Sequence, residues 1–281
     1  MTPFSSGEQL PRTQLPAKAC DCHMHVFDAT REPVGGAVVR PPTATIADYQ
    51  LVKARLGTSR HVLVQPSTYG TDNSLMLAAL EQRRECARGI AVVDSSVADR
   101  ELQRMNEAGV VGVRFNQVQA GATTMEMLAS VASRVSKMGW HIQLHLAGQQ
   151  LIDYEERLLA LDATIVLDHY ARVHHSPEIS DAVQATLGRL MSSGHVWLKL
   201  SAPYLSSQSD ERPFDDLAQT AAALIKDFPE RLVWGTDWPH ATESGKPDDA
   251  RLLDWFADIV PDVGIRQRIF VDNPAVLYAF E

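Results

Sequence analysis

Eight short apolar runs alternate with helix-like segments along the chain, and this alternation constrains the fold more than any other feature. The runs are residues 18–25, 61–67, 88–95, 112–116, 141–146, 165–170, 196–202 and 232–238. Apolar strands that alternate with helices are typical of repeated βα units around a parallel sheet. The 281 residues suit one (β/α)8 TIM barrel, which takes about 250 residues. An open, doubly wound sheet is the alternative.

The segments between these runs carry the boundary signals of helices. Thr45 and Asp48 form the Thr-x-x-Asp pattern of a helix N-terminus. Gly109, Gly139 and Gly194 follow predicted helices, at the position where a left-handed cap favours glycine. The sequence therefore predicts α/β architecture throughout the repeated part of the chain.

One domain boundary is expected, near the N-terminus. Residues 1–17 are largely polar and contain Pro11 and Pro16, so we expect a flexible N-terminal arm. Residues 18–281 show no linker or shift in composition, which predicts a single barrel domain. The Gly- and Pro-rich stretch 27–43 follows the first run, and in a barrel it would lie at the catalytic mouth as a lid.

Charge and apolar patterning exclude several partners. The net charge of −9 argues against nucleic-acid binding, which depends on neutralising phosphates with Lys and Arg. The chain has no signal-peptide pattern and no apolar run near the roughly 20 residues that cross a bilayer. We therefore expect a cytoplasmic protein without membrane contact. The sequence leaves the oligomeric state open, a homo-oligomer included.

The three cysteines do not form the pattern of a disulfide framework. Cys20 and Cys22 share one face of the first predicted strand, since side chains alternate along a strand. Asp21, His23 and His25 should then lie on the other face. We expect the cysteines to pack outward beneath helices and the histidines to point into the barrel.

Polar residues gather at the carboxyl ends of the predicted strands, which face one pocket in a (β/α)8 barrel. They are His23, His25, Arg114, Asn116, His145, His169 and Asp237. This coincidence predicts the active site of an enzyme.

The histidines and Asp237 suit acid–base or metal chemistry. His23 and His25 are two residues apart, so both rings approach one point. Asp237 is a candidate metal ligand, a general base, or both. His169 would polarise a carbonyl group or position a water. Alternation predicts that Asp168 faces away from the pocket and is structural.

Cationic and phenolic side chains nearby suggest an anionic substrate. Arg114 has the planar fork that binds a carboxylate with two hydrogen bonds, a barrel-filling salt bridge being the alternative. Arg172 is placed to reach an anion, and Tyr204 is a residue of the pocket edge. Lys199 and Ser201 share one face of their strand, and Lys199 either faces the pocket or pairs with a core acid.

A metal ion is one of two interpretations that the residues leave open. His23, His25, His145 and Asp237 would supply three nitrogens and one oxygen, a set suited to one divalent ion, Zn²⁺ above all. The nearby cation Arg114 disfavours a second ion. Metal-free catalysis, with Asp237 acting alone on water, is the other interpretation.

Six motifs and the chain ending carry a resemblance to the amidohydrolase superfamily, and within it to the 2-pyrone-4,6-dicarboxylate lactonase branch. They are residues 20–28, 62–73, 88–94, 112–116, 168–172, 234–240 and 273–278. The resemblance implies hydrolysis of a cyclic ester without a required metal. It also implies roles, with Asp237 as the base, His23, His25 and His169 on the lactone carbonyl, and Arg114 and Arg172 on carboxylates.

The chain departs from this branch at two places and from the wider superfamily at a third. Residues 117–121 contain no arginine where the lactonase has one, and His145 replaces a tyrosine. The bridging lysine usual in the superfamily's fourth strand is absent, which argues against two metals. The expected substrate is therefore an anionic pyrone, muconolactone or sugar-acid lactone. Alternatives are a decarboxylase of an aromatic or muconic acid, a lactone isomerase, or a non-catalytic binding protein.

Overall fold

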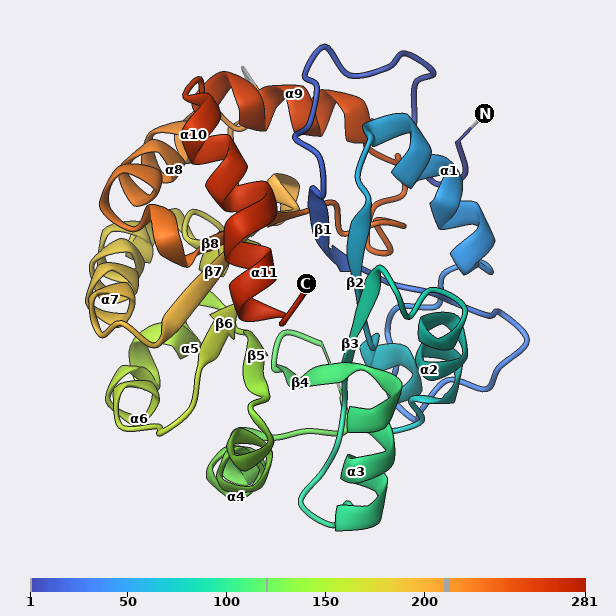
Figure 1. The fold of residues 1–281 in the computed structure, drawn as a ribbon. Helices are drawn as coiled ribbons and strands as arrows, with labels where there is room; N and C mark the ends of the chain where they lie inside the picture. Colours follow the sequence, from blue (N-terminus) through green and yellow to red (C-terminus); the bar gives the residue numbers. More distant parts are fainter. Residues whose placement is uncertain (1, 120, 210–212) are drawn as a thin grey trace.

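The strands form a single parallel barrel. The structure is a computed structural model that describes residues 2–119, 121–209 and 213–281. Within these residues, eight parallel strands pair in sequence order, which confirms the predicted (β/α)8 fold (Figure 1). The strands are β1 (Cys20–Met24), β2 (Arg60–Val64), β3 (Ala87–Ala91), β4 (Val110–Asn116), β5 (His141–His145), β6 (Ile165–Leu167), β7 (Val196–Ser201) and β8 (Leu232–Gly235).

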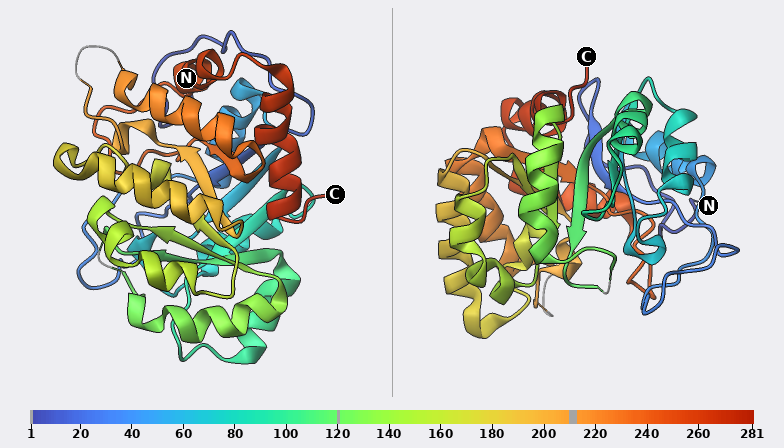
Figure 2. Two further views of the ribbon diagram at one scale, coloured as in Figure 1. Left: turned by 90° about the vertical axis from the view of Figure 1, so that its left-hand side faces the viewer. Right: turned by 90° about the horizontal axis from the view of Figure 1, so that it is seen from below.

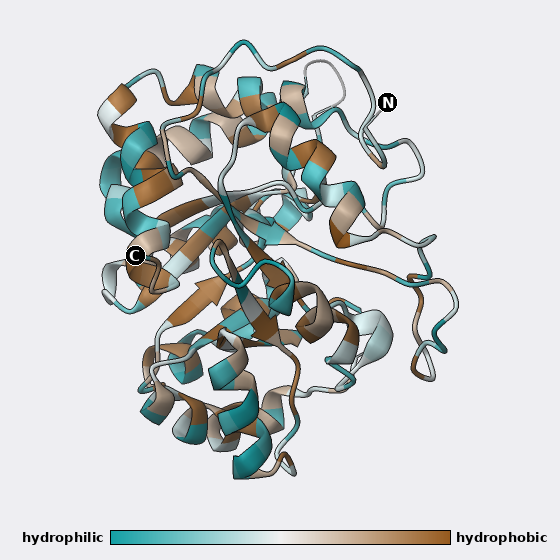
Figure 3. Ribbon diagram, turned by 45° about the vertical axis from the view of Figure 1, so that its right-hand side comes forward, coloured by the Kyte–Doolittle hydropathy of each residue, from teal (hydrophilic) through white to brown (hydrophobic). Residues whose placement is uncertain are grey.

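Helices surround the barrel on its outside (Figure 2). They are α1 (Ile46–Leu56), α2 (Ser74–Glu81), α3 (Asp99–Ala108), α4 (Leu128–Val135), α5 (Gly148–Asp153), α6 (Glu155–Leu159), α7 (Ser180–Ser192), α8 (Asp215–Asp227), α9 (Asp249–Ile259), α10 (Val263–Gln267) and α11 (Asn273–Leu277). The strands are largely apolar, whereas the helices combine apolar and polar residues (Figure 3). The helices therefore bury one side against the sheet and expose the other.

The helix boundaries follow the predicted signals. Thr45 caps α1 with a complete capping box, in which the Thr45 side chain accepts from the Asp48 amide and the Asp48 carboxylate accepts from the Thr45 amide. Gly109 and Gly139 adopt the left-handed conformation predicted for them, with φ values of 100° and 76°. Local sequence thus determined where these elements start and stop.

Strand β1 and the segment after β8 close the barrel. The His25 amide donates to the Trp238 carbonyl at 2.8 Å, and the Asp237 amide donates to the His23 carbonyl at 2.8 Å. The buried Asp21 carboxylate accepts from the Thr236 hydroxyl at 2.6 Å. Burial raises the pKa of Asp21 to about 6, although hydrogen bonds from Thr236 oppose the shift. The closure brings His23, His25 and Asp237 side by side.

The predicted outward packing of Cys20 and Cys22 is wrong. Both cysteines belong to an apolar cluster with Val62 of β2, Val166 of β6 and Val233 of β8. Side chains from strands on different sides of a closed barrel meet only in its interior. The register of β1 against β2 shifts between Asp21 and Met24, so one extra residue lies in β1. This bulge breaks the alternation and lets Cys22 and His23 both point inward.

The C-terminal residues cover the end of the barrel opposite the carboxyl ends of the strands. Tyr278 and Phe280 join the interior cluster that holds Cys22. The guanidinium groups of Arg60 and Arg88, at the starts of β2 and β3, lie 5.1 and 4.6 Å from the centre of the Phe280 ring. In Figure 1 the C-terminus accordingly lies near the centre of the ring of strands. These residues do not cover the other end of the barrel, where the carboxyl ends of the strands lie.

The N-terminal segment, predicted as an arm, lies against α1 and α9. The Phe4 ring packs edge-on against Trp238, and the Ser5 hydroxyl accepts from Arg55 at 3.1 Å. The Thr13 amide donates to Asp254 at 2.9 Å. The polar composition of residues 1–17 gave no sign of these contacts.

The loop of residues 27–43 follows β1, as expected for a lid. The Val34 amide donates to the Thr68 carbonyl at 2.9 Å, and the Thr68 hydroxyl donates to the Val39 carbonyl at 2.9 Å. These contacts hold the loop beside the pocket, which Val39 lines. In the described part of the chain, no helix is both long and apolar enough to cross a membrane.

Candidate active site

A pocket opens at the carboxyl ends of the strands, where the sequence predicted it. Its empty space is about 430 Å³, part of it open to solvent. It is lined by His25, Phe27, Val39, Pro66, Ser67, Thr68, Arg114, Asn116, Gln119, His145, His169, Leu205, Asp237, Ala241 and Thr242. Six of these residues carry the polar groups that the sequence singled out: His25, Arg114, Asn116, His145, His169 and Asp237.

His23, His25 and Asp237 converge on one point at the floor of this pocket. The two Nε2 atoms of His23 and His25 lie 3.2 Å apart. Oδ1 of Asp237 lies 3.4 Å from His25 Nε2 and 3.6 Å from His23 Nε2. His169 contributes a further ring nitrogen, with Nε2 3.9 Å from the same oxygen. The arrangement places one carboxylate oxygen against three imidazoles.

Contacts on the far side of the His25 and His23 rings hold both rings against Asp237. His25 Nδ1 lies 2.7 Å from the Val64 carbonyl, which only accepts, so Nδ1 carries the proton and donates. The Nε2 atom then faces Asp237 with a lone pair in the neutral ring and with a second N–H in the protonated ring. His23 Nδ1 lies within ion-pair distance of Asp168 Oδ1, at 3.3 Å, and 3.4 Å from Lys199 Nζ. Burial lowers the pKa of His23 well below its ordinary value, although the charge of Asp168 opposes the shift.

The three converging atoms fit a divalent metal ion. Ligand atoms about 2.0–2.1 Å from a tetrahedral Zn²⁺ lie roughly 3.3–3.4 Å from one another. The three separations, 3.2, 3.4 and 3.6 Å, bracket that value. Where both Nε2 atoms are unprotonated, their lone pairs and the carboxylate repel one another, and a cation among them removes the repulsion. His23, His25 and Asp237 therefore form a group that could hold one ion.

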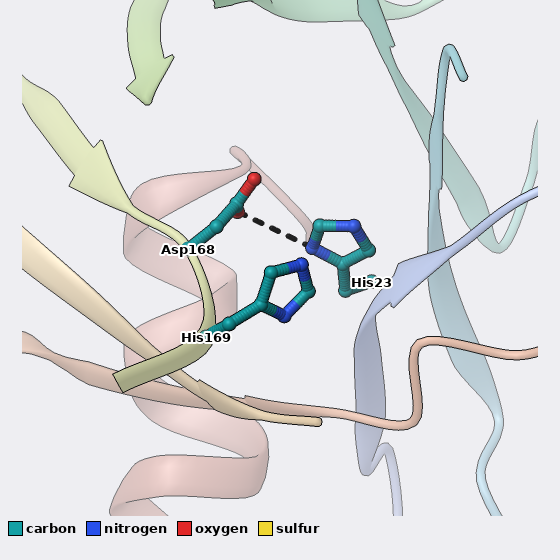
Figure 4. Close-up of side chains that lie close together, drawn as sticks. All are labelled: His23, Asp168 and His169. Atoms are coloured by element: carbon teal, nitrogen blue, oxygen red, sulfur yellow. Dashed lines mark ion pairs between the residues drawn. The ribbon is translucent and has the colours of Figure 1, made fainter. Parts of the chain in front are cut away.

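The prediction that Asp168 faces away from the pocket is wrong. Asp168 and His169 both turn toward His23, although they are neighbours in sequence (Figure 4). The reason is a left-handed turn after β6, in which His169, Tyr170, Ala171 and Arg172 have φ values of 52–54°. Four non-glycine residues in this region are strained. Such strain is typical of functional segments held by their surroundings.

Asp168 is the centre of a buried charge network beneath the pocket. Its Oδ2 accepts from Arg114 Nε and from Gln143 Nε2, both at 3.1 Å. Lys199 lies 3.9 Å from Oδ1 and donates to Gln143 Oε1 at 2.7 Å. Burial alone would raise the pKa of Asp168, but His23 and Arg114 outweigh it and lower the pKa well below the ordinary value. Lys199 thus pairs with a core acid, one of its two predicted arrangements.

The same network disfavours a metal ion at a second group. His23, Asp168 and His169 are close enough to hold one. However, Lys199 Nζ already lies 3.4 Å from His23 Nδ1, and Arg114 occupies the other oxygen of Asp168. Two cations there oppose a third positive charge.

The predicted substrate-binding residues on β4 have different surroundings. Arg114 uses Nε on Asp168, and its side chain lines the pocket. Asn116 also lines the pocket, but its amide nitrogen donates to the Ser67 hydroxyl at 2.9 Å. Its amide oxygen accepts from the backbone of Val118 and Gln119. Asn116 therefore holds the loop after β4.

His145, Arg172 and Tyr204 lie around this centre. The His145 ring packs edge-on against His169 in the pocket wall, outside both candidate metal groups. Among described residues, neither ring nitrogen of His145 nor Nε of Arg172 has a hydrogen-bond partner. Arg172 is 8% exposed and does not line the pocket. The Tyr204 hydroxyl donates to Asp237 Oδ2 at 2.9 Å.

Asp237 is held in its ionised form. Burial would raise its pKa, but the rings of His169, His25 and His23 outweigh burial and lower the pKa well below the ordinary value. Two further residues extend the contacts of Tyr204 away from Asp237. His240 contacts the Tyr204 hydroxyl, and Asp249 contacts His240; the sequence analysis assigned neither a role. His240 ends the Gly-Thr-Asp-Trp-Pro-His motif, and Asp249 lies in a helix with no motif to mark it.

Comparison with known proteins gives relatives along nearly the whole chain. A 2-pyrone-4,6-dicarboxylate hydrolase of Comamonas testosteroni is 34% identical, over 95% of this chain and 92% of its own. A 4-sulfomuconolactone hydrolase of Rhizobium radiobacter is 33% identical, over 94% and 91%. A D-galactarolactone isomerase of Agrobacterium fabrum is 29% identical, over 95% and 93%.

Solved structures and a family model agree with these relatives. A crystal structure from Agrobacterium tumefaciens superposes with a TM-score of 0.88 at 28% identity, covering 96% of this chain and 99% of that one. The family model described as amidohydrolase matches residues 20–280. The match covers all eight strands and every residue of the His23, His25, His169 and Asp237 centre. The chain therefore belongs to the amidohydrolase family.

Proposed function

We propose that the protein is a hydrolase that opens the ring of a small, carboxylate-bearing lactone. The observation that carries this proposal is the convergence of three histidines on Asp237 Oδ1 beneath a pocket that Arg114 lines. A carboxylate base beside imidazoles suits attack of water on a carbonyl carbon. Two relatives are named as hydrolases of a pyrone dicarboxylate and of a sulfomuconolactone, both cyclic esters with an acidic group.

Asp237 acts on water in this mechanism. It accepts a proton as the water oxygen bonds to the lactone carbonyl carbon. The ring C–O bond then breaks, and the proton passes to the departing ring oxygen, so that lactone and water give a hydroxy acid. The low pKa of Asp237 keeps it ionised at neutral pH and therefore able to accept. In metal-free protein, N–H groups of His23, His25 and His169 would orient the reacting carbonyl; with an ion held by His23 and His25, His169 remains for the carbonyl.

Arg114 binds the substrate's acidic group. Its Nε is anchored on Asp168, which leaves the outer edge of the guanidinium for an anion. A fixed, planar donor pair is suited to a carboxylate or sulfonate. Arg172 and Tyr204 lie outside the pocket wall, so contacts from them require a movement of the surrounding loops. We propose Arg114 as the principal anion contact.

A metal ion fits the same centre. We propose Zn²⁺ on His23, His25 and Asp237, because two imidazole nitrogens and one carboxylate match its preferences. His145, predicted as a fourth ligand, lies beside His169, outside that group. When bound, such an ion supplies Lewis-acid polarisation. The protein's part is to hold the ion with oriented rings and to exclude a second ion through Arg114 and Lys199.

A lactone isomerase is a second candidate, since one relative is named D-galactarolactone isomerase. The two reactions differ in whether water enters the product. Hydrolysis adds one water per lactone, whereas isomerisation gives a product of unchanged mass. A decarboxylase would instead release carbon dioxide.

The test is turnover of a lactone panel in ¹⁸O-labelled water, followed by mass spectrometry of the products. The panel contains 2-pyrone-4,6-dicarboxylate, 4-sulfomuconolactone and D-galactarolactone. We expect a ring-opened acid with one ¹⁸O from at least one lactone. Asp237→Asn should lower kcat roughly 10²–10⁴-fold, the range for loss of a general base.

The control is Asp227→Asn, which makes the same change at an exposed position on α8. It should leave turnover unaltered. A product of unchanged mass would favour the isomerase, and released carbon dioxide the decarboxylase. Asp237→Asn with more than half of the parent kcat would contradict the assignment of the base.

A further inference from the structure

A chain of buried hydrogen bonds runs from Asp237 away from the pocket. The Tyr204 hydroxyl lies 2.9 Å from Asp237 Oδ2 and 2.9 Å from His240 Nδ1. His240 Nε2 lies 3.2 Å from Asp249 Oδ1. His240 is fully buried, and Asp249 is 1% exposed. Neither residue lines the pocket, so both can affect the reaction solely through their neighbours.

The number of protons in this chain determines its direction. Tyr204 has one hydroxyl proton, and the ionised Asp237 can only accept. Tyr204 therefore donates to Asp237, and its oxygen accepts from His240 Nδ1–H. A further proton lies between His240 Nε2 and Asp249 Oδ1, because two lone pairs at 3.2 Å would repel. The two hydrogen bonds nearest Asp237 therefore both point toward it.

The backbone around the motif needs such support. Asp237 and His240 both have left-handed backbones, with φ values of 65° and 54°. The His240 amide donates to the Asp237 carbonyl at 2.8 Å, and Lys246 Nζ donates to the His240 carbonyl at 2.6 Å. Strained residues keep such conformations only where surrounding contacts determine them. Here the contacts fix His240 at both its backbone and its ring.

We propose that Tyr204 and His240 are positioning residues that hold Asp237 for the reaction, with Asp249 behind the His240 ring. The chain occupies Oδ2 of Asp237 and so leaves Oδ1 as the oxygen that faces His23, His25 and His169. Without it, the carboxylate could rotate about its side-chain bonds and present either oxygen. Hydrogen-bonding partners of catalytic groups and metal ligands commonly have this effect. The inference rests on the proposed role of Asp237 in lactone hydrolysis.

The test uses two amides that each replace one nitrogen of His240. His240→Asn keeps a donor near the Nδ1 position and loses the contact with Asp249. His240→Gln places its amide near the Nε2 position and loses the donor to Tyr204. We expect His240→Gln and Tyr204→Phe each to lower kcat roughly 10–100-fold. His240→Asn should retain most of the parent kcat, and KM should stay within about twofold throughout.

A double variant separates positioning from general loss of structure. Tyr204→Phe removes the hydroxyl that links His240 to Asp237, so a change at His240 can no longer act on Asp237 through it. Tyr204→Phe with His240→Gln should therefore be no slower than Tyr204→Phe alone, which is the non-additivity of coupled residues. His195→Gln is the matched control. His195 directly precedes β7, at the end of the barrel opposite the site, and its Nε2 contacts the Leu158 carbonyl.

The outcomes distinguish this inference from the proposed function. If no lactone is turned over by the unchanged protein, the proposed function fails. If the parent is active but the two amide variants lose kcat equally, or the losses of Tyr204→Phe and His240→Gln add, the positioning chain is wrong. Melting temperatures identify any variant that has merely lost its fold.

Discussion

His23 Nδ1 lies 3.3 Å from Asp168 Oδ1, and this contact holds the His23 ring against a buried carboxylate. Asp168 is fully shielded and also receives Arg114 Nε. One carboxylate therefore orients both a ring of the reacting centre and the arginine of the pocket wall. Because Asp168 contacts both His23 and Arg114, a change in Asp168 should affect both the chemical step and substrate binding.

The first prediction concerns this carboxylate. Asp168→Asn keeps the shape but removes the negative charge, which leaves Arg114 and Lys199 without a counter-charge. We expect kcat to fall roughly 10–100-fold as His23 loses its orientation. The free energy of unfolding should fall by about 3–5 kcal/mol, as for a broken buried pair. Steady-state kinetics and urea unfolding measure the two effects, and a parent-like kcat in a folded variant would contradict the orienting role.

The second prediction concerns binding of the substrate's acid group. Arg114→Met should mainly raise KM, because the contact is present in ground and transition states alike. A loss of about 2–5 kcal/mol in binding is expected for a buried charge contact. Arg189→Met is the control, since Arg189 pairs with Glu155 on the surface. An unchanged KM for an anionic lactone, with the fold intact, would overturn the assignment.

The third prediction concerns the metal ion. His25→Ala should lower the zinc content of the purified protein, because His25 Nε2 is one of the three converging ligands. His145→Ala should retain the zinc, since His145 lies outside that group. Excess Zn²⁺ at 100 times its dissociation constant should stabilise the parent by about 2.7 kcal/mol. Elemental analysis and thermal unfolding provide the readouts. Full activity in metal-free protein would exclude a catalytic ion.

The fourth prediction concerns stability in acid. Burial lowers the pKa of His61 to about 3, with the charges of Lys53 and Arg83 adding to the effect. The same residue in the unfolded chain has a pKa of about 6.5. Below that pH, His61 binds a proton in the unfolded chain but stays unprotonated in the folded protein. Stability should therefore fall from pH 6.5 toward pH 3, by about 2 kcal/mol between pH 7 and pH 5 for this residue.

His61→Phe tests that origin, because neither ring nitrogen of His61 has a partner among the described residues. The difference in unfolding free energy between parent and variant should be constant from pH 7 to pH 8. It should then grow in favour of the variant as the pH falls. Parallel stability curves over the whole range would show that His61 does not titrate as expected.

Local patterns in the sequence determined the elements of the barrel and much of its site. The eight apolar runs predicted the eight strands, because short apolar runs that alternate with helical segments are typical of buried strands. Thr45 and Gly109 set helix ends through contacts within a few residues. His25 and Asp237 could be assigned to one pocket from strand position alone, since a barrel brings the carboxyl ends together.

Other features were determined only by the tertiary structure. They are departures from the regular alternation of side chains along a strand, and contacts between segments that are distant in the sequence. The bulge in β1 turned Cys22 inward, and the left-handed turn after β6 brought both Asp168 and His169 to His23. Neither irregularity has a glycine or another local marker, because surrounding packing stabilises it. Tyr204, from a separate segment of the chain, links Asp237 to His240, which in turn contacts Asp249. Such links form only when closure of the barrel places those segments side by side, so local sequence carries no sign of them.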